Sequence, residues 1–268
     1  MTDGVLEWDD DLSSAYRSAM RQAAADGLPL GRLFDPALGD ADRDRVFLWY
    51  QRCHEAIRLP MAHAVPSRQA VFVIAQFSPV IEIGAGTGYW ARLIRQRTGA
   101  DIVAFDRVAR PPDVLACDDL AAVLQEHTGR TLFLCWPDLS DMGSVALQAY
   151  TGDIVLYIGE SFGRTLHGDF SQTGNAAFHL GLVSRFHEIL RLPLPNWPGN
   201  RDCLSVFKRT ETLTMSVGDP PSIETFQHVP PDERIDLAAS SPAGERILQQ
   251  AAAMRPCARR ASCHRTHT

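Results

Sequence analysis

The first part of the chain carries hydrophobic residues at the spacing of amphipathic helices. Asp10 or Asp11 can cap a helix whose apolar positions recur three and four residues apart, namely Leu12, Ala15, Tyr16, Ala19, Met20 and Ala23. The same spacing returns over Ala41 to Leu59, and Pro66 suits the first turn of a third helix that ends near Gln76. We therefore predict three helices before the first strand, with residues 1–60 forming a helical cap over a ligand pocket.

From position 80 onward, short apolar runs alternate with segments of helical period. The predicted strands are Val80 to Ile83, Asp101 to Asp106, Asp113 to Cys117, Thr131 to Cys135, Asp153 to Ile158, Glu188 to Leu192 and Asp202 to Lys208. This alternation predicts an α/β domain over residues 61–210, with a mostly parallel sheet and an antiparallel last strand. Beyond Thr210 the periodicity weakens, and we expect residues 211–268 to form a largely disordered tail with one brief helix over Gly244 to Ala253.

The stretch PVIEIGAGTGYWARLI, from Pro79 to Ile94, joins a buried strand to a helix through three alternate glycines, Gly84, Gly86 and Gly88. Glycine lets the backbone adopt positive φ there and lets a ligand approach it closely. Tyr89 stands where the dinucleotide fingerprint G-x-G-x-x-G has its third glycine, which argues against a pyrophosphate at this helix end. An acid, here Glu82, followed by G-x-G-x-G is typical of a site for S-adenosylmethionine (SAM), whose cationic amino-acid end suits a carboxylate.

The second predicted strand also ends in an acid, Asp106. A carboxylate at that place can accept hydrogen bonds from both hydroxyls of a ribose. Enzymes that use NAD have the same feature, so Asp106 alone does not separate the two cofactors, whereas the glycine spacing and Glu82 favour SAM. The alternative is a strand-turn-helix unit that binds nothing, with Asp106 as a turn residue.

These features resemble the class I SAM-dependent methyltransferases, and the resemblance covers about Leu59 to Arg209. It is closest to a loosely characterised group of bacterial methyltransferase-like proteins, through HAVPSRQA (His63 to Ala70), EIGAGTGYWARL (Glu82 to Leu93), Trp136-Pro137 and the segment from Pro193 to Phe207. The resemblance implies a Rossmann-like methyltransferase fold and SAM as the cofactor. It also implies a set of cofactor-binding residues: Glu82, Gly84, Ala85, Gly86, Gly88, Tyr89, Asp106, Cys117, Asp118 and Trp136. It does not name a substrate.

Residues after the predicted fourth and fifth strands are the catalytic candidates, because ligands of open α/β sheets lie outside the carboxyl ends of the strands. Asp138 stands where amino-methyltransferases carry D/N-P-P-Y/F, but Trp136 replaces the polar first residue, so the amine clamp of those enzymes is not supported. Asp138 is either a base or amine anchor, or a turn acid. Glu160 is either a second catalytic acid or a solvated strand-end carboxylate. Trp136 packs either on the cationic sulfonium or in the core.

Three further residues border the predicted site. Trp197 lies in the proline-rich loop LPLPNWPGN and can wall the pocket. His63 precedes the third helix at the predicted lid. His167, in a glycine-flanked loop after the fifth strand, is either a base or a surface histidine.

Composition and charge indicate which kinds of partner and location the protein has. The chain has 268 residues, of which 45% are hydrophobic and 22% charged, which suits one full core. Its net charge of -6 and the lack of a basic stripe give no indication of nucleic-acid binding. No apolar run approaches the roughly 20 residues of a membrane helix. The acidic N-terminus has no signal-peptide core, so we expect a cytoplasmic protein.

The cysteines indicate no metal site. Cys53, Cys117, Cys135 and Cys203 lie in apolar or mixed segments and are expected to be reduced, mostly buried thiols. The two cysteines of the tail lie near arginines and histidines at a spacing that fits no standard zinc pattern.

The sequence therefore predicts a SAM-dependent methyltransferase that acts on a small molecule, of the kind found in specialised metabolism. The helical cap and the acidic pI favour a small acceptor over nucleic acid. The alternative is a catalytically inactive SAM-binding regulatory or partner protein, because no recognised base motif is present. An NAD-dependent oxidoreductase is disfavoured by Tyr89 and Glu82. Neither the acceptor atom nor the oligomeric state is predicted.

Overall fold

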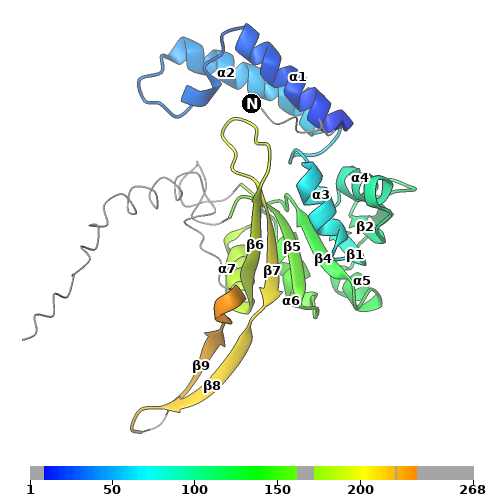
Figure 1. The fold of residues 1–268 in the computed structure, drawn as a ribbon, viewed down its shortest axis with the longest axis vertical. Coiled ribbons are helices and arrows are strands. Elements are labelled where there is room, and N and C mark those ends of the chain that lie inside the picture. The colour runs from blue at the N-terminus through cyan, green and yellow to red at the C-terminus, as the bar shows by residue number, and fades with distance from the viewer. Residues whose placement is uncertain (1–8, 162–171, 221, 234–268) are drawn as a thin grey trace, which may run out of the picture.

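The computed structural model of the protein describes residues 9–161, 172–220 and 222–233, and its centre is a seven-stranded sheet (Figure 1). The strands are β1 (Val80–Ile83), β2 (Ile102–Asp106), β3 (Leu115–Ala116), β4 (Thr131–Cys135), β5 (Ile154–Gly159), β6 (Phe186–Pro193) and β7 (Cys203–Arg209). Their order is β3-β2-β1-β4-β5-β7-β6. Strands β1 to β5 pair in parallel, whereas β7 is antiparallel to both of its neighbours. This is the topology of the class I methyltransferases, and it confirms the predicted fold class.

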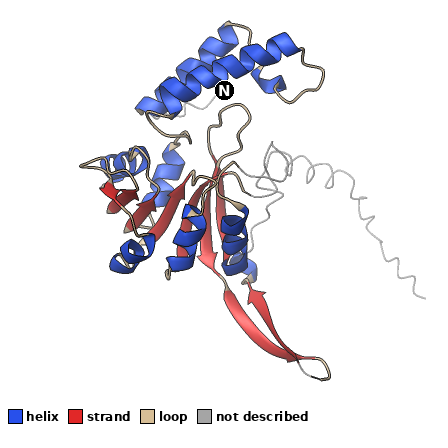
Figure 2. Ribbon diagram, turned by 180° about the vertical axis from the view of Figure 1, so that it is seen from behind, coloured by secondary structure: helices blue, strands red, loops and turns tan. Residues whose placement is uncertain are grey.

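The apolar runs of the central strands are continuous because both faces of the sheet are covered. Successive residues of β4 point to opposite faces, so that Phe133 joins one core cluster while Leu132 and Leu134 join the other. The first cluster is completed by α3 (Arg68–Ala75) and α4 (Tyr89–Thr98), and the second by α5 (Leu120–Glu126), α6 (Met142–Ala149) and α7 (Ala176–Arg185). Figure 2 shows α6 and α7 in front of the strands.

The helices before α3 stand beyond one end of the sheet, next to the loop that joins β6 to β7 (Figure 1). They are α1 (Asp11–Ala25), the short 3-10 turn η1 (Leu30–Arg32), α2 (Asp40–Cys53) and a π-helical turn, η2 (His54–Arg58), that continues α2. The predicted N-cap is present, since the Asp10 side chain accepts a hydrogen bond from Ser13 N at 3.0 Å. A third cluster, which includes Trp49 of α2 and Trp197 of the β6–β7 loop, joins these helices to the sheet.

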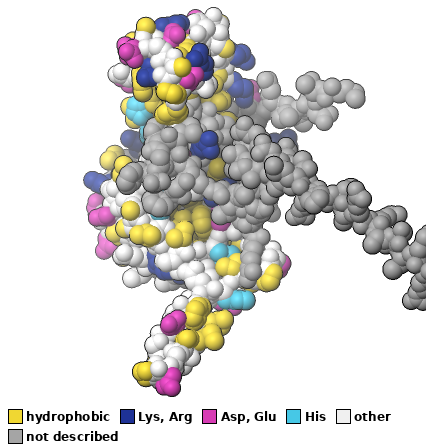
Figure 3. Space-filling model, turned by 90° about the vertical axis from the view of Figure 1, so that its left-hand side faces the viewer, with side chains coloured by type: hydrophobic (Ala, Val, Ile, Leu, Met, Phe, Trp, Pro, Cys, Tyr) yellow, Lys and Arg dark blue, Asp and Glu magenta, His cyan; other side chains and the backbone are white. Residues whose placement is uncertain are grey.

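A hairpin of two strands, β8 (Glu211–Val217) and β9 (Ser222–His228), extends from the end of β7. The expectation of disorder was therefore wrong for this part of the tail. The first strand of the hairpin has apolar residues at alternate positions, Leu213, Met215 and Val217, which is the period of a strand. All residues of the two strands are exposed, and Figure 3 shows apolar side chains along the hairpin. A 3-10 turn, η3 (Pro231–Glu233), follows, and Glu233 binds His187 of β6 at 2.8 Å. The expected helix over Gly244 to Ala253 lies outside the described residues.

Two further expectations concern membrane-spanning helices and the state of the cysteines. Among the described residues, no helix has the length and apolar character needed to cross a bilayer. The four cysteines of the body are free thiols, with Cys53 and Cys117 buried and Cys135 and Cys203 half-buried.

Candidate active site

The glycine loop between β1 and α4 is closely packed at its ends and open in its middle. Gly84, Gly86 and Gly88 have φ of 72°, 56° and 72°, which is the region where glycine is favoured. A Cβ on Gly84 would lie 2.6 Å from Met142 Cε, and one on Gly88 would lie 2.6 Å from Val114 Cγ2. A Cβ on Gly86 would meet no atom within 4 Å. A ligand can therefore lie against the backbone at Gly86.

Asp106, the last residue of β2, holds the glycine loop in place through a hydrogen bond. Gly86 N donates to Asp106 Oδ2 at 2.9 Å, and Val108 N donates to Asp106 Oδ1 at 3.0 Å. Because a carboxylate oxygen has two acceptor sites, each oxygen of Asp106 can accept one more hydrogen bond. Asp106 thus holds the loop and keeps acceptor capacity for a ligand.

Two cavities meet at the glycine loop. The small cavity has a volume of about 140 Å³, and its walls include Arg58, Glu82, Tyr89, Trp90 and Cys135. The large cavity has a volume of about 770 Å³ and extends from Asp106, Cys117 and Leu120 to Asp138, Asp141 and Met142. Four residues line both cavities: His63, Gly84, Gly86 and Trp136.

Glu82 brings an unsatisfied acid into the small cavity. The residue is 2% exposed, and its Oε2 has no hydrogen-bond partner among the described residues. Burial raises the pKa of Glu82 to about 8, and the nearby charge of Asp106 adds to the effect. A buried carboxyl with a free oxygen is costly in the absence of a partner, so this position favours a ligand that carries a cation or a donor.

Arg58 brings an unsatisfied cation into the same cavity, and the sequence analysis did not identify it. The residue is 2% exposed, and one guanidinium nitrogen donates to the hydroxyl of Tyr50. Its Nε and Nη2 have no partner among the described residues. Since a guanidinium stays charged, these donors require an anion or another acceptor. The small cavity is therefore lined by two buried residues with unsatisfied polar atoms, the acid Glu82 and the cation Arg58.

Trp136 lies at the junction of the cavities in a constrained conformation. Its φ is 55°, and among the described residues it is the one non-glycine with positive φ. Its indole N–H donates to Asp202 Oδ1 at 2.9 Å. Asp202 is 1% exposed, and burial together with the charge of Glu160 raises its pKa to about 7. The guanidinium carbon of Arg58 lies 5.0 Å from the centre of the Trp136 ring. Asp202 thus orients a side chain that walls both cavities.

His63 faces Trp136 across a stacked contact. The ring centres are 4.8 Å apart and the ring planes differ by 14°. The Nδ1 atom of His63 is enclosed and has no hydrogen-bond partner within the described part of the chain. Burial, followed by the charges of Arg58 and His54, lowers the pKa of His63 to about 4. The imidazole is therefore neutral at physiological pH.

The structure gathers most of the predicted cofactor-binding residues around the two cavities. Glu82, Ala85 and Tyr89 line the small one, and Asp106, Cys117 and Asp118 line the large one. Gly88 lines neither and instead permits close packing against Val114.

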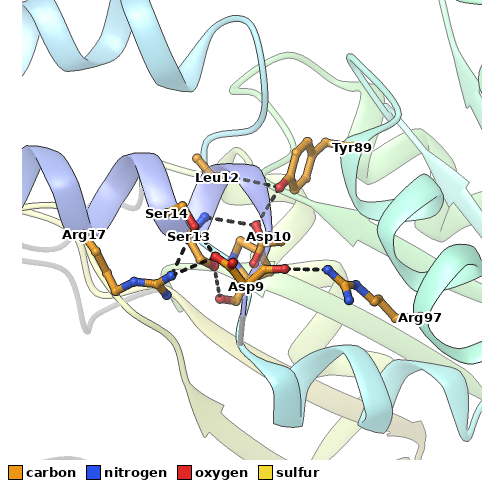
Figure 4. Close-up of polar contacts among 9 residues, drawn as sticks. Asp9, Asp10, Leu12, Ser13, Ser14, Arg17, Tyr89 and Arg97 are labelled. Atoms are coloured by element: carbon orange, nitrogen blue, oxygen red, sulfur yellow. Dashed lines mark hydrogen bonds and ion pairs between the residues drawn. The ribbon is translucent and has the colours of Figure 1, made fainter. Parts of the chain in front are cut away.

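Tyr89 has a second set of contacts, drawn in Figure 4. Its hydroxyl accepts a hydrogen bond from Leu12 N at 2.9 Å and donates one to Asp10 Oδ1 at 2.6 Å. This side chain ties the start of α4 to the start of α1, which accounts for a tyrosine at the position where a dinucleotide site has glycine.

The two predicted catalytic acids are placed differently. Asp138 lines the large cavity, and its Oδ1 accepts hydrogen bonds from the backbone N–H and the hydroxyl of Ser140, as a turn acid does. Glu160 is fully buried, and its oxygens accept from Arg201 N at 2.9 Å and Gln172 N at 3.4 Å. Glu160 lines neither of the two cavities at the glycine loop.

Of the two remaining candidates, Trp197 and His167, the structure describes only Trp197. Trp197 is 1% exposed and packs against Trp49 and Tyr16, with ring centres 6.3 and 5.0 Å away, so it joins the helical cap to the sheet. Trp197 does not line either of the two cavities at the glycine loop. His167 lies outside the described residues.

Comparison with known proteins gives similarities in structure alone. Neither the known protein families nor the curated proteins gave a match to this sequence. Among solved structures, the chain is similar to 1,6-didemethyltoxoflavin-N1-methyltransferase of Burkholderia thailandensis, with 14% identity, a TM-score of 0.38 and coverage of 74% of this chain and 91% of that one. It is also similar to an O-methyltransferase from Bacillus cereus, with 14% identity, a TM-score of 0.38 and coverage of 71% and 100%.

A third similar structure is the N-methyltransferase NodS from Bradyrhizobium japonicum, with 14% identity, a TM-score of 0.36 and coverage of 74% and 99%. These overall similarities are low and carry no argument by themselves, and a shared fold does not define an activity. The strand order, with its antiparallel β7, supports the assignment directly. The chain therefore has the fold of the class I SAM-dependent methyltransferases.

Proposed function

We propose that the protein is a SAM-dependent methyltransferase that acts on a small-molecule acceptor. The observation that carries this proposal is the pair of buried, unsatisfied groups in the small cavity, the carboxyl of Glu82 and the guanidinium of Arg58. The amino-acid end of SAM carries an ammonium and a carboxylate. This ligand would satisfy both groups at once.

The remaining parts of SAM fit the residues around the glycine loop. Asp106 retains one acceptor site on each oxygen for a ribose diol. Cys117 and Leu120 offer apolar surface to an adenine in the large cavity. When bound, SAM supplies a methyl group already activated for transfer by its sulfonium.

The chain's own contribution is to hold the reactants in line and to exclude water. Arg58 and Glu82 would fix the amino-acid end, and the open backbone at Gly86 would support the nucleoside. Trp136 borders both cavities, so its ring can face the sulfonium cation. Its orientation is fixed by the hydrogen bond to Asp202.

The large cavity supports a small acceptor rather than a polyanion. Its volume of about 770 Å³ lies in the range of small-molecule pockets. Four carboxylates line it against one guanidinium, namely Asp106, Asp118, Asp138 and Asp141 against Arg107. A phosphate backbone would be repelled by this surface.

Calorimetric titration of the full chain tests the proposal. We expect SAM and its demethylated product, S-adenosylhomocysteine (SAH), to bind, and NAD to give no heat of binding. Arg58→Met should weaken SAM by roughly 10–100-fold through loss of a charge-assisted contact. Arg52→Met, which changes an exposed arginine of α2, the helix that the turn carrying Arg58 continues, is the matched control. A preference for NAD, or equal SAM affinity in the Arg58 variant and the wild type, would contradict the proposal.

A second assay separates an enzyme from a protein that binds SAM without transfer. The wild-type chain is incubated with methyl-labelled SAM and a filtered small-molecule extract. Labelled product indicates a methyltransferase. SAM binding with no transfer of label would support the inactive regulatory alternative.

A further inference from the structure

We infer that His63 receives the proton that the methyl acceptor loses, and that the acceptor is a hydroxyl compound, an alcohol or a phenol. This inference rests on the proposed function, because it describes the acceptor side of the same site. It also gives a role to the segment HAVPSRQA, which the proposed cofactor contacts leave unexplained.

Position is the first argument. A methyl donor with its amino-acid end in the small cavity and its nucleoside in the large one would have its sulfonium where the two cavities meet. Of the four described residues that line both cavities, His63 is the one with a titratable side chain. The segment before it is attached to the glycine loop, because the Thr87 hydroxyl donates to the carbonyl of Met61.

Orientation is the second argument. The imidazole stacks on Trp136, and Trp136 is itself fixed by Asp202. A ring held in this way is preorganised for proton transfer. The described part of the chain gives its enclosed Nδ1 no hydrogen-bond partner, so the ring is not committed to a structural hydrogen bond there.

Charge is the third argument, and it selects the acceptor. The guanidinium carbon of Arg58 lies 5.0 Å from the Trp136 ring on which His63 stacks, and a bound sulfonium would add another positive charge, so burial and these charges keep the imidazole neutral and only weakly basic. Glu82 also lines the small cavity, and Asp202 lies behind Trp136. A weak neutral base readily accepts a proton from an oxygen that has taken a methyl group, because a protonated ether is a far stronger acid than imidazolium. It does not accept one from a methylated amine, whose nitrogen holds its proton more tightly.

The step is balanced without any further reactant. The hydroxyl oxygen uses a lone pair to form a bond to the methyl carbon, while the carbon–sulfur bond breaks and its electron pair stays on sulfur. The hydroxyl proton passes to the imidazole of His63 and then to solvent. The positive charge moves from the sulfonium to the imidazolium, so the net charge of the site stays constant during transfer.

The predicted acids are less suited to this step. Asp138 lies in the large cavity but is bonded to Ser140, and the oxygens of Glu160 are bonded to backbone N–H groups.

The experiment compares two neighbouring histidines in the full chain. His63→Phe keeps an aromatic ring against Trp136 and removes the basic nitrogens. His54→Phe is the matched control, because the His54 ring lies 5.6 Å from His63 and lines neither cavity of the described residues. Methyl transfer from labelled SAM to a panel of alcohols, phenols and amines and to the filtered extract is measured, with SAM affinity measured by calorimetry.

We expect His63→Phe to lower turnover by roughly 10²–10⁴-fold with SAM affinity within about threefold of wild type. His54→Phe should leave both within about threefold, and the labelled product should be a methyl ether. A second variant, His63→Gly, should regain turnover when millimolar imidazole is added.

Three results would overturn the inference: full turnover in His63→Phe, loss of SAM binding equal to the loss of turnover, or a methyl group on nitrogen or carbon. A His63→Gly variant that binds SAM and is not rescued by imidazole would also contradict it. Failure of the proposed function is distinguishable, because the wild type would then transfer no label to any acceptor.

Discussion

Replacing Glu82 with glutamine should make the ligand-free protein more stable and at the same time abolish tight SAM binding. The two effects have one cause. The folded protein holds a carboxyl group in a dry cavity without a full set of partners, and the proposed ligand supplies the missing cation. A residue that only supported the fold would give a loss of stability instead.

The magnitude follows from the pKa of Glu82, which rises from 4.5 to about 8 in the folded protein. At about 1.4 kcal/mol for each tenfold change in an ionisation constant, the ionised form is disfavoured by about 5 kcal/mol. Because the folded-state pKa is raised, the contribution to stability is fully present below about pH 4.5 and is lost as the pH rises through about 8. Glutamine does not ionise, but its amide lacks partners as well. We therefore expect a net gain of about 2 kcal/mol above about pH 8, which is a rise of roughly 4–8 °C in Tm.

The assay is thermal unfolding at about pH 6 and about pH 8.5, followed by calorimetric titration with SAM. The gain in Tm should be larger at the higher pH, and SAM affinity should fall by roughly 10–100-fold. Glu126→Gln, at an exposed glutamate of α5, is the matched control and should change neither quantity. A Glu82→Gln protein that is less stable than wild type at the higher pH, or that binds SAM normally, would refute the reasoning.

Four other substitutions test the glycine loop and its surroundings. Gly86→Val should abolish SAM binding and leave a folded protein, since a side chain there meets no protein atom. Gly88→Val should instead lower Tm, because its side chain meets Val114. Calorimetry and thermal unfolding measure the two effects, and SAM binding by the Gly86→Val protein would count against the site. Asp106→Ala should weaken SAM by roughly 2–4 kcal/mol in the same titration, and an unchanged affinity would exclude a ribose contact. Tyr89→Phe removes the hydrogen bonds to Asp10 and Leu12 and should destabilise the protein by roughly 1–3 kcal/mol in urea unfolding; an unaltered midpoint would show that the α1–α4 contact adds nothing.

Periodicity predicted the strands of the sheet because they are short apolar runs and many of the turns beside them are marked by glycine or proline. The antiparallel last strand was likewise predicted, from the alternation of strands and helices. The β8–β9 hairpin was missed. Its alternation of Leu213, Met215 and Val217 is followed by a turn rich in Gly, Asp and Pro, and this composition is also typical of disordered segments.

The sequence predicted the residues of the candidate site that belong to a local motif. It did not predict the contacts that arise only from tertiary packing. Glu82, Asp106 and the glycines follow from strand ends and spacing. Arg58 lies in a π-helical turn and lines the same cavity as Glu82 of β1, and Asp202 reaches Trp136 from the residue before β7, so no short motif contains either relation. Strand-end position suggested Glu160 as a catalytic acid, but it does not determine whether a carboxylate turns toward a cavity or toward backbone N–H groups.

The most direct test of the central claim is the number of protons released when SAM binds the full chain. Calorimetric titration at about pH 7 in buffers of different ionisation enthalpy measures it. Since the pKa of Glu82 is about 8 in the ligand-free protein and its carboxylate must be charged to hold an ammonium, we predict release of about one proton, and less at higher pH. Methylthioadenosine, which lacks the amino-acid end, should bind far more weakly and release none. Proton-neutral binding of SAM, or equal affinity for the two ligands, would contradict the account.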